Sequence, residues 1–313
     1  MNSSEIIKDQ YKLIKDIGKG SFGYVYLVED TKNNNKQYAI KRIHSSKLLE
    51  SEYLLKAFKL ELEVMKKCEC DNSVQLIEFF QTSHFHNIVM ELCEGDLDSI
   101  LKTKETGFSE EEVRNILLQL NNVFKIMNRE NIIHRDLKLK NILYSVINPN
   151  IDLNLKKGLN LSDEYNDKAN NKLATKSDKL TVKLTDFGFS KILDEDITST
   201  KLGTPATMAP EIMMNVNKGY TNKADLWSIG VILYQLLFKK LPFTGNNEHD
   251  LLNNIKTKTL AFPVTKKLSD NCRELLVKLL QVDPDVRLNW KDYYEHPFFK
   301  DENEEDDVYF FII

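Results

Sequence analysis

The chain has 313 residues, of which 42% are hydrophobic and 29% are charged, a composition typical of a soluble folded protein. Its formal net charge of −4 excludes a general electrostatic attraction to nucleic acid or to anionic membranes. The amino-terminal residues contain no apolar core of a signal peptide. The longest apolar run, residues 227–238, is too short to span a bilayer. We therefore expect a cytoplasmic or nuclear protein with no nucleic-acid partner and no membrane span.

A glycine-rich stretch near the amino terminus, IGKGSFGYVYLVED from Ile17, predicts a loop between two strands. The segments on either side of it, residues 11–17 and 24–30, alternate in the manner of strands, and the second is rich in β-branched and aromatic residues. Glycine loops of this spacing bind phosphates in two kinds of nucleotide site, one followed by a helix and the other by a strand. The strand after Gly23 favours the second kind, although a glycine-rich turn without a ligand would have a similar sequence.

The remaining pattern divides the chain into a strand-rich part and a helical part. Further strands are predicted at residues 38–43, 74–80 and 86–93, with one helix at 54–68. From Ser109 the pattern is helical, and Ser109 with Glu112 forms a capping-box signature. Later helices are predicted at residues 223–238, 248–257 and 269–281. This order predicts an α+β fold with two lobes and a cleft between them.

We expect two lobes, one insertion and a tail. Residues 1–93 would form the strand-rich lobe, residues 94–301 the helical lobe, and residues 302–313 an acidic tail with an apolar end. Within the helical lobe, residues 148–179 are rich in Asn, Lys and Asp and poor in apolar residues. This composition predicts a mobile surface insertion, placed in a turn between two strands where added length is tolerated.

Two motifs in the helical part carry groups suited to phosphoryl transfer. The stretch IIHRDLKLKNIL contains Asp136, Lys138 and Asn141, and VKLTDFGFS places Asp186 between a strand and a glycine. Asp186 and Asn141 offer the oxygen ligands that Mg²⁺ prefers. Asp136 could orient an acceptor hydroxyl and accept its proton, and Lys138 could offset charge on the transferred group. Lys41 could reach the other phosphates if a carboxylate holds it in place.

The sequence resembles the eukaryotic-type protein kinases. The motifs that carry the resemblance are GKGSFGYV, YAIK, HRDLKLKN, DFG, APE and DLWSIG, in this order between about Tyr11 and Phe299. The resemblance implies a small antiparallel-sheet lobe with one main helix and a larger, mainly helical lobe. It also implies ATP and Mg²⁺ as cofactors and a protein substrate that receives the γ-phosphoryl group of ATP.

The resemblance assigns roles to particular residues. The residues expected to bind the nucleotide are Ile17, Gly18, Lys19, Gly20, Ser21, Phe22, Gly23, Tyr24, Val25, Ala39, Lys41, Met90, Glu91, Cys93 and Leu143. Asn141 and Asp186 would bind the metal, and Asp136, Lys138, Lys41 and Glu61 would be catalytic. Glu52 and Glu63 are alternatives to Glu61 as the partner of Lys41, and the position of Glu61 four residues before Met65 matches the family pattern.

Further contacts follow from the same resemblance. Met65, Leu76, His134 and Phe187 would form a stacked apolar spine between the lobes. Glu211 would pair with Arg287, and Asp225 would brace the catalytic loop. Thr204 would contact Asp136 and Lys138.

The resemblance also indicates a subtype and a form of regulation. Lys138 after HRDL, together with GTPATMAPE, is similar to serine/threonine kinases. Arg135 before Asp136 resembles kinases that are switched on by phosphorylation, which predicts a phosphoprotein modified at Thr200. An upstream kinase or a second copy of the chain would add this phosphate, and Thr198 and Ser199 are alternative positions.

Within the superfamily, KLTDFGFS, APEIMM and LNWKDYYEHPFF look most like ULK-type, autophagy-initiating kinases. A calcium/calmodulin-type catalytic domain without its regulatory tail is the alternative. A non-catalytic pseudokinase scaffold is the rival from another functional class. Pseudokinases usually lack the residues that match Lys41, Asp136 or Asp186, and this chain has all three.

Overall fold

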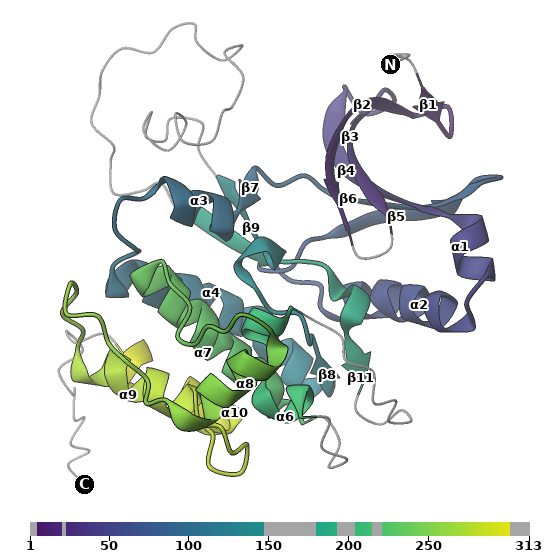
Figure 1. The fold of residues 1–313 in the computed structure, drawn as a ribbon. Helices are drawn as coiled ribbons and strands as arrows, with labels where there is room; N and C mark the ends of the chain where they lie inside the picture. Colours follow the sequence, from purple (N-terminus) through teal and green to yellow (C-terminus); the bar gives the residue numbers. More distant parts are fainter. Residues whose placement is uncertain (1–4, 21–22, 147–179, 193–203, 215–220, 301–313) are drawn as a thin grey trace, which may run out of the picture.

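The computed structural model describes residues 5–20, 23–146, 180–192, 204–214 and 221–300. These residues form a strand-rich lobe and a larger helical lobe (Figure 1). The predicted α+β class and the two-lobed arrangement are confirmed. The predicted insertion at 148–179 and the tail at 302–313 lie outside the described residues.

The strand-rich lobe is built on one antiparallel sheet with the strand order β1-β2-β3-β4-β6-β5. Its strands are β1 (Ile6–Ile7), β2 (Tyr11–Lys19), β3 (Tyr24–Asp30), β4 (Lys36–His44), β5 (Leu76–Gln81) and β6 (Phe85–Glu91). All the strands predicted for this lobe are present, with ends that differ by a few residues. The curled sheet stands above the helical lobe in Figure 1.

The pairing register decides which residues of this sheet share a face with Lys41. Val25 lies opposite Lys41, and Ala39 lies opposite Met90. Because residues that are directly paired share a face of the sheet, and residues two apart on a strand do as well, these four share one face. The opposite face is covered by a second small core that includes Ile40.

Two helices complete this lobe, α1 (Ser45–Leu49) and α2 (Glu52–Lys67). The hydroxyl of Ser51 caps α2 by accepting a hydrogen bond from the backbone N–H of Leu54. The inward face of α2 buries Phe58, Glu61 and Met65, which are spaced as one side of a helix requires. The inward face of α2 therefore holds one buried carboxylate, that of Glu61, among apolar side chains.

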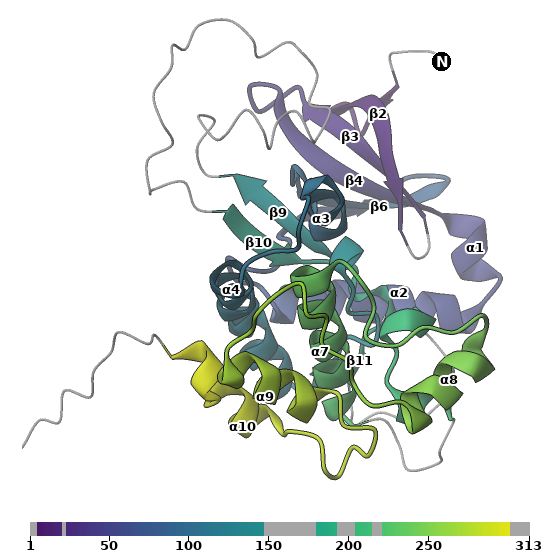
Figure 2. The ribbon, with the colours of Figure 1, turned by 60° about the vertical axis from the view of Figure 1, so that its left-hand side comes forward.

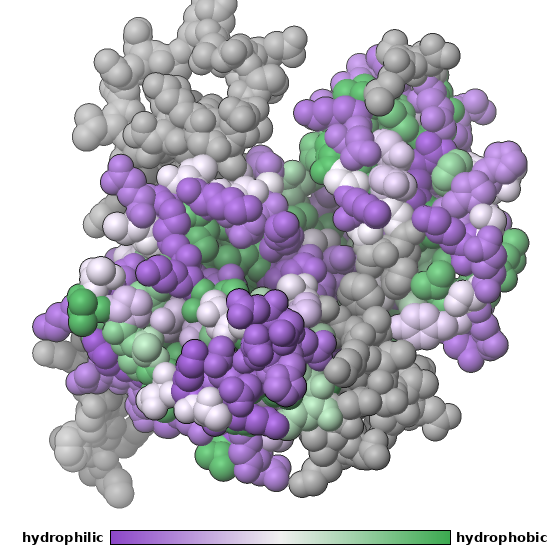
Figure 3. All heavy atoms as spheres, in the orientation of Figure 1, coloured by the Kyte–Doolittle hydropathy of each residue, from purple (hydrophilic) through white to green (hydrophobic). Residues whose placement is uncertain are grey.

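The helical lobe surrounds one central helix, α7 (Lys223–Phe238), in which every residue except Lys223 and Gln235 is buried. The other helices are α3 (Leu97–Thr103), α4 (Glu110–Arg129), α6 (Pro210–Met213), α8 (Glu248–Thr257), α9 (Asp270–Leu279) and α10 (Trp290–Tyr294). Helix α7 packs against α4 and α9 (Figure 2), and the predicted capping box of α4 is present. No helix in the described part of the chain is long and apolar enough to cross a membrane. The face seen in Figure 3 is mainly hydrophilic.

Short strands between the lobes flank the two motifs that contain Asp136 and Asp186. One sheet has the order β10-β9-β7, with β7 (Gly95–Asp96), β9 (Ile142–Val146) and β10 (Leu180–Leu184). A second sheet pairs β8 (Ile132–Ile133) with β11 (Lys191–Ile192). Strands β9 and β10 are antiparallel neighbours, so the insertion joins two paired strands, as predicted.

Candidate active site

A buried lysine, Lys41, lies on β4 on the same face of the sheet as Val25, Ala39 and Met90. Lys41 Nζ is 2.5 Å from Glu61 Oε1 and 3.4 Å from Asp186 Oδ1. Glu52 and Glu63 form ion pairs with exposed lysines on α2 instead. Of the three glutamates considered from the sequence, Glu61 is the one that contacts Lys41.

The charges in this cluster shift one another's protonation. Burial acts to lower the pKa of Lys41, but the carboxylates of Glu61 and Asp186 outweigh it and raise the pKa. Burial also raises the pKa of Glu61, and the charge of Lys41 opposes this rise. Lys41 is therefore held as a cation in a buried position, where its charge is worth more than it would be in water.

A second polar cluster surrounds the buried carboxylate of Asp136. Lys138 Nζ is 2.5 Å from Asp136 Oδ2 and 3.0 Å from Thr204 Oγ1. The Thr204 hydroxyl donates to Asp136 Oδ1 at 2.8 Å. Asn141 Nδ2 donates to both the backbone oxygen and Oδ2 of Asp136. The predicted contacts of Thr204 are present, and three side chains fix the direction of the carboxylate.

Hydrogen bonds to Asp225 hold the backbone of the loop that contains Asp136. The Asp225 carboxylate accepts hydrogen bonds from the backbone N–H groups of His134, at 2.8 Å, and Arg135, at 3.1 Å. Burial raises the pKa of Asp225, against the effects of His134 and of these hydrogen bonds. Arg135 has φ 66°, a left-handed conformation that is costly for a non-glycine residue. The Asp225 contacts stabilise this backbone, as the resemblance to protein kinases implied.

Asn141 and Asp186 are brought together by the pairing of β9 and β10. Ile142 lies opposite Leu184, and the N–H of Thr185 donates to the backbone oxygen of Asn141 at 3.0 Å. The amide nitrogen of Asn141 is committed to Asp136, which leaves its amide oxygen as the atom for a metal. A carboxylate and an amide oxygen from adjacent segments suit a hard cation such as Mg²⁺.

The described part of the glycine loop reaches over Lys41. The N–H of Gly20 donates to the oxygen of Gly23 at 2.9 Å. A Cβ atom on Gly20 would lie 3.0 Å from Lys41 Cε, and one on Gly23 would lie 2.2 Å from the backbone oxygen of Arg42. Only glycine allows these approaches without displacement. Ser21 and Phe22 lie outside the described residues.

The other residues predicted to bind the nucleotide lie on the main sheet, on the neighbouring small sheet and in the linker between β6 and β7. Val25, Ala39 and Met90 share the sheet face of Lys41, and Leu143 pairs with Asp96 on the neighbouring small sheet. Glu91 ends β6, and Cys93 lies in the hinge, the linker of residues 92–94 between β6 and β7. Gly18, opposite Val25, belongs to the same strand pair.

Three predicted residues, Ile17, Lys19 and Tyr24, have exposed side chains. Lys19 Nζ lies 5.9 Å from the centroid of the Tyr24 ring. These two side chains contact each other at the surface.

Comparison with known proteins identifies this arrangement. The sequence model of the protein kinase domain matches residues 11–299. The chain belongs to the protein kinase family. Its relatives include serine/threonine-protein kinase ULK1 of Homo sapiens, 33% identical over 285 residues, which are 90% of this chain and 24% of that protein. Serine/threonine-protein kinase ATG1b of Arabidopsis thaliana is 34% identical over 311 residues, 97% of this chain and 38% of the relative.

Calcium-dependent protein kinase 4 of Plasmodium berghei (strain Anka) is similar to the same degree. It is 31% identical over 315 residues, 98% of this chain and 52% of the relative. The chain therefore spans about half or less of the length of these relatives.

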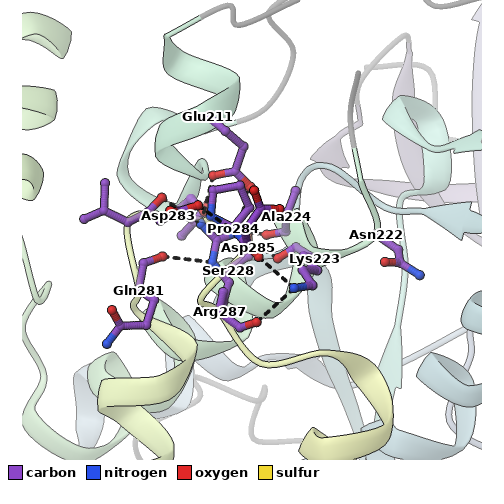
Figure 4. Close-up of polar contacts among 12 residues, drawn as sticks. Glu211, Asn222, Lys223, Ala224, Ser228, Gln281, Asp283, Pro284, Asp285 and Arg287 are labelled. Carbon is purple, nitrogen blue, oxygen red and sulfur yellow. Dashed lines mark hydrogen bonds and ion pairs between the residues drawn. The ribbon is translucent and has the colours of Figure 1, made fainter. Parts of the chain in front are cut away.

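Two further contacts expected of a kinase domain are present. The rings of His134 and Phe187 lie 5.2 Å apart, in the same core as Met65, with Leu76 packed against it. Arg287 donates to both carboxylate oxygens of Glu211, at 2.7 and 2.8 Å (Figure 4). Because Glu211 follows the segment of Thr204 in the chain, this ion pair anchors that segment to the helical lobe.

The structure does not describe the predicted phosphorylation site. Thr200 and its alternatives, Thr198 and Ser199, lie outside the described residues. Within the described part, the guanidinium of Arg135 donates to the backbone oxygen of Ser190 at 3.3 Å. Phosphorylation at Thr200 stays a prediction.

One buried ion pair beside the site was not predicted. Lys183 Nζ on β10 lies 3.0 Å from Glu91 Oε1 at the start of the hinge. The signal in the sequence was a lysine between Val182 and Leu184 in a strand whose neighbours are fully buried. A lysine is seldom buried without a partner, so this position could have been marked for one.

Proposed function

We propose that this chain is an ATP-dependent serine/threonine protein kinase, which transfers the γ-phosphoryl group of ATP to a hydroxyl of a protein substrate. The proposal depends on one observation, the presence of two arrangements of side chains in the same chain. In the first, Thr204, Lys138 and Asn141 orient the carboxylate of Asp136. In the second, the buried Lys41 contacts the carboxylate of Asp186. Phosphoryl transfer depends mainly on positioning and charge stabilisation, and these groups supply both.

Each group has a separate part in the proposed reaction. Lys41 would neutralise phosphate oxygens, and Glu61 would hold its ammonium in place. Asp186 and Asn141 would hold Mg²⁺, which supplies charge neutralisation on the phosphates when it is bound. Asp136 would orient the acceptor hydroxyl and accept its proton.

The Thr204 contact supports an aliphatic hydroxyl as the acceptor. The Thr204 hydroxyl reaches Asp136 Oδ1 at 2.8 Å, which demonstrates that an aliphatic hydroxyl fits beside this carboxylate. Lys138 contacts both groups, so its charge is available where a phosphoryl group would arrive. Relatives named as serine/threonine kinases support the same class of substrate.

For the subfamily, we propose a ULK-like kinase in the cytoplasm. The motifs KLTDFGFS, APEIMM and LNWKDYYEHPFF support this assignment. The calcium-dependent alternative is retained, because the identities to ULK1 and to calcium-dependent protein kinase 4 are 33% and 31%. Activation at Thr200 by an upstream kinase or by a second copy of the chain belongs to the same proposal.

A radiolabel assay tests the activity. Purified protein is incubated with γ-labelled ATP, Mg²⁺ and a mixed protein acceptor, and the product is hydrolysed for phosphoamino-acid analysis. We expect phosphoserine and phosphothreonine in the wild type. We expect D136N to lose about 10²- to 10⁴-fold in rate, the range for removing a general base. The matched control is D285N, at an exposed loop position, which should retain the wild-type rate.

Two results would contradict the proposal. D136N with the turnover of the wild type would remove Asp136 from the reaction. A wild-type protein that labels no acceptor would favour the pseudokinase scaffold.

A further inference from the structure

Lys183 joins three segments that are distant in the sequence. Its ammonium is 3.0 Å from Glu91 Oε1, at the end of β6. The same ammonium donates to the backbone oxygen of Asp71, in the loop between α2 and β5, at 2.8 Å. Only about a tenth of the Lys183 side chain and a fifth of the Glu91 side chain are exposed. We call this contact the hinge ion pair.

The loop reached by Lys183 is itself bonded to the helical lobe. Asn72 Nδ2 donates to the backbone oxygen of Val182 on β10 at 2.9 Å. The N–H of Leu184 donates to the oxygen of Asn72, and the N–H of Val74 donates to the oxygen of Leu184, both at 2.9 Å. Residues 70–75, which connect two elements of the strand-rich lobe, are therefore attached to β10.

The carboxylate of Glu91 completes the connection to the hinge. Its Oε1 accepts a second hydrogen bond, from the N–H of Gln75, at 2.7 Å, and the N–H of Glu91 donates to the oxygen of Gln75 at 3.1 Å. One oxygen atom thus links the start of the hinge, the loop and Lys183. Because the pair is mostly buried, salt screens it less than an exposed pair.

We infer that Lys183 is a positioning residue for the nucleotide. Through Glu91 it fixes the backbone of the hinge, and it lies three residues before Asp186 on the same strand and its extension. The hinge ion pair would therefore couple the segment proposed to contact adenine with the carboxylate proposed to bind the metal. This inference rests on the proposed function for its nucleotide part, whereas the coupling of hinge and β10 stands on the contacts alone.

The physical consequence of losing Lys183 is a less ordered hinge. Glu91 Oε1 would keep the N–H of Gln75 as its donor and lose its tie to β10. A nucleotide would then have to order the hinge when it binds, and this ordering lowers affinity. Among the described residues, no hydrogen bond or ion pair joins the groups around Asp136 to the hinge ion pair, so the rate of the chemical step should hold.

The experiment compares K183M, E91Q and the double variant with the wild type. K183R serves as the charge-conserving rescue. K278M is the matched control, because Lys278 forms an exposed i,i+4 pair with Glu274 on α9. The first readout is hydrogen exchange of nucleotide-free protein over residues 89–97, which needs no catalysis. The second is the Kd for Mg-ADP by calorimetry, with KM and kcat for ATP beside it.

We expect faster hinge exchange in K183M and E91Q, and wild-type exchange in K278M. We expect the Kd for Mg-ADP and the KM for ATP to rise about 3- to 10-fold, equivalent to about 0.7–1.4 kcal/mol, with kcat within about 2-fold. The double variant should match the single variants, because both remove one interaction. K183R should restore most of the affinity.

The inference is overturned if K183M keeps the exchange and Kd of the wild type, or if kcat falls while KM holds. Additive effects in the double variant would also overturn it. A wild type that binds no Mg-ADP would contradict the proposed function and the nucleotide part of the inference. The exchange data would still decide whether Lys183 holds the hinge.

Discussion

Two buried ion pairs in the described part of the chain differ in how fully their hydrogen-bonding atoms are used. In the helical lobe, Arg287 donates to both oxygens of Glu211 and to the backbone oxygens of Gln281 and Lys223 (Figure 4). In the strand-rich lobe, Lys41 contacts one oxygen of Glu61. The other oxygen of Glu61 is buried without a hydrogen-bond partner among the described residues.

The difference separates a structural pair from a pair suited to a ligand. A buried charge whose donors and acceptors are all used is satisfied, and it fixes the backbone around it. A buried pair with an unused acceptor is costly by itself, and this pair lies beside Asp186, within the site proposed to bind a nucleotide. We therefore expect damage to the first pair to appear as lost stability and damage to the second as lost activity.

The largest expected effect is on stability, in R287A. Removing the guanidinium leaves the Glu211 carboxylate with an uncompensated charge and takes a donor from three backbone oxygens, those of Gln281, Lys223 and Val282. Breaking a buried ion pair in this way costs about 3–5 kcal/mol. Denaturant unfolding measures the loss, and R129A is the control because Arg129 is mostly exposed. An R287A protein as stable as R129A would contradict the claim that the Arg287–Glu211 pair stabilises the fold.

The next effect is on activity, in K41M. Removing a positioned group that stabilises charge in the reaction, here the ammonium proposed to neutralise phosphate oxygens, typically costs about 10²- to 10³-fold in rate. The steady-state rate measures it, and K56M is the control, because Lys56 lies on exposed α2 surface and pairs with Glu52. Folded K41M protein with more than a tenth of the wild-type rate would remove Lys41 from the proposed mechanism.

The smallest expected effect is on the pH dependence of the unfolding free energy of K41M. Without Lys41, burial should raise the pKa of Glu61 further above its ordinary value of 4.5. The folded state then keeps a proton that the unfolded state releases, so the unfolding free energy falls as pH rises above about 4.5. We expect the stability of K41M to fall behind that of the wild type between about pH 5 and 8. A gap that stays constant over this range would show that Glu61 does not titrate as described.

The sequence predicted the parts of the fold and site that lie in continuous runs. Residues 24–30 were predicted as a strand because they alternate, and α7 was predicted because apolar residues dominate residues 227–238. The motif around Asp136 was complete within ten residues. Strand β1 and helix α1 were missed because they have two and five residues, too few for a periodic signal.

Contacts between residues that are far apart in the sequence could not be predicted from the residues alone. The residues alone left Glu52, Glu61 and Glu63 open as partners of Lys41, and the inward face of α2 decided among them. The hinge ion pair escaped notice because Lys183 and Glu91 lie on strands that are far apart in the sequence. Their meeting depends on how β10 and β6 pack around the loop at residues 70–75.

The most direct test of the account is Mg²⁺-dependent nucleotide binding by the wild type and D186N. A ligand that binds only the folded state raises the melting temperature, and the stabilisation grows with the logarithm of the ligand concentration divided by its Kd. The account predicts that ATP with Mg²⁺ stabilises the wild type, that ATP with a chelator does so much less, and that D186N has lost this difference. A D186N protein that responds to Mg-ATP as the wild type does would contradict the account, because Lys41, Asn141 and Asp186 would then not share a metal–nucleotide site.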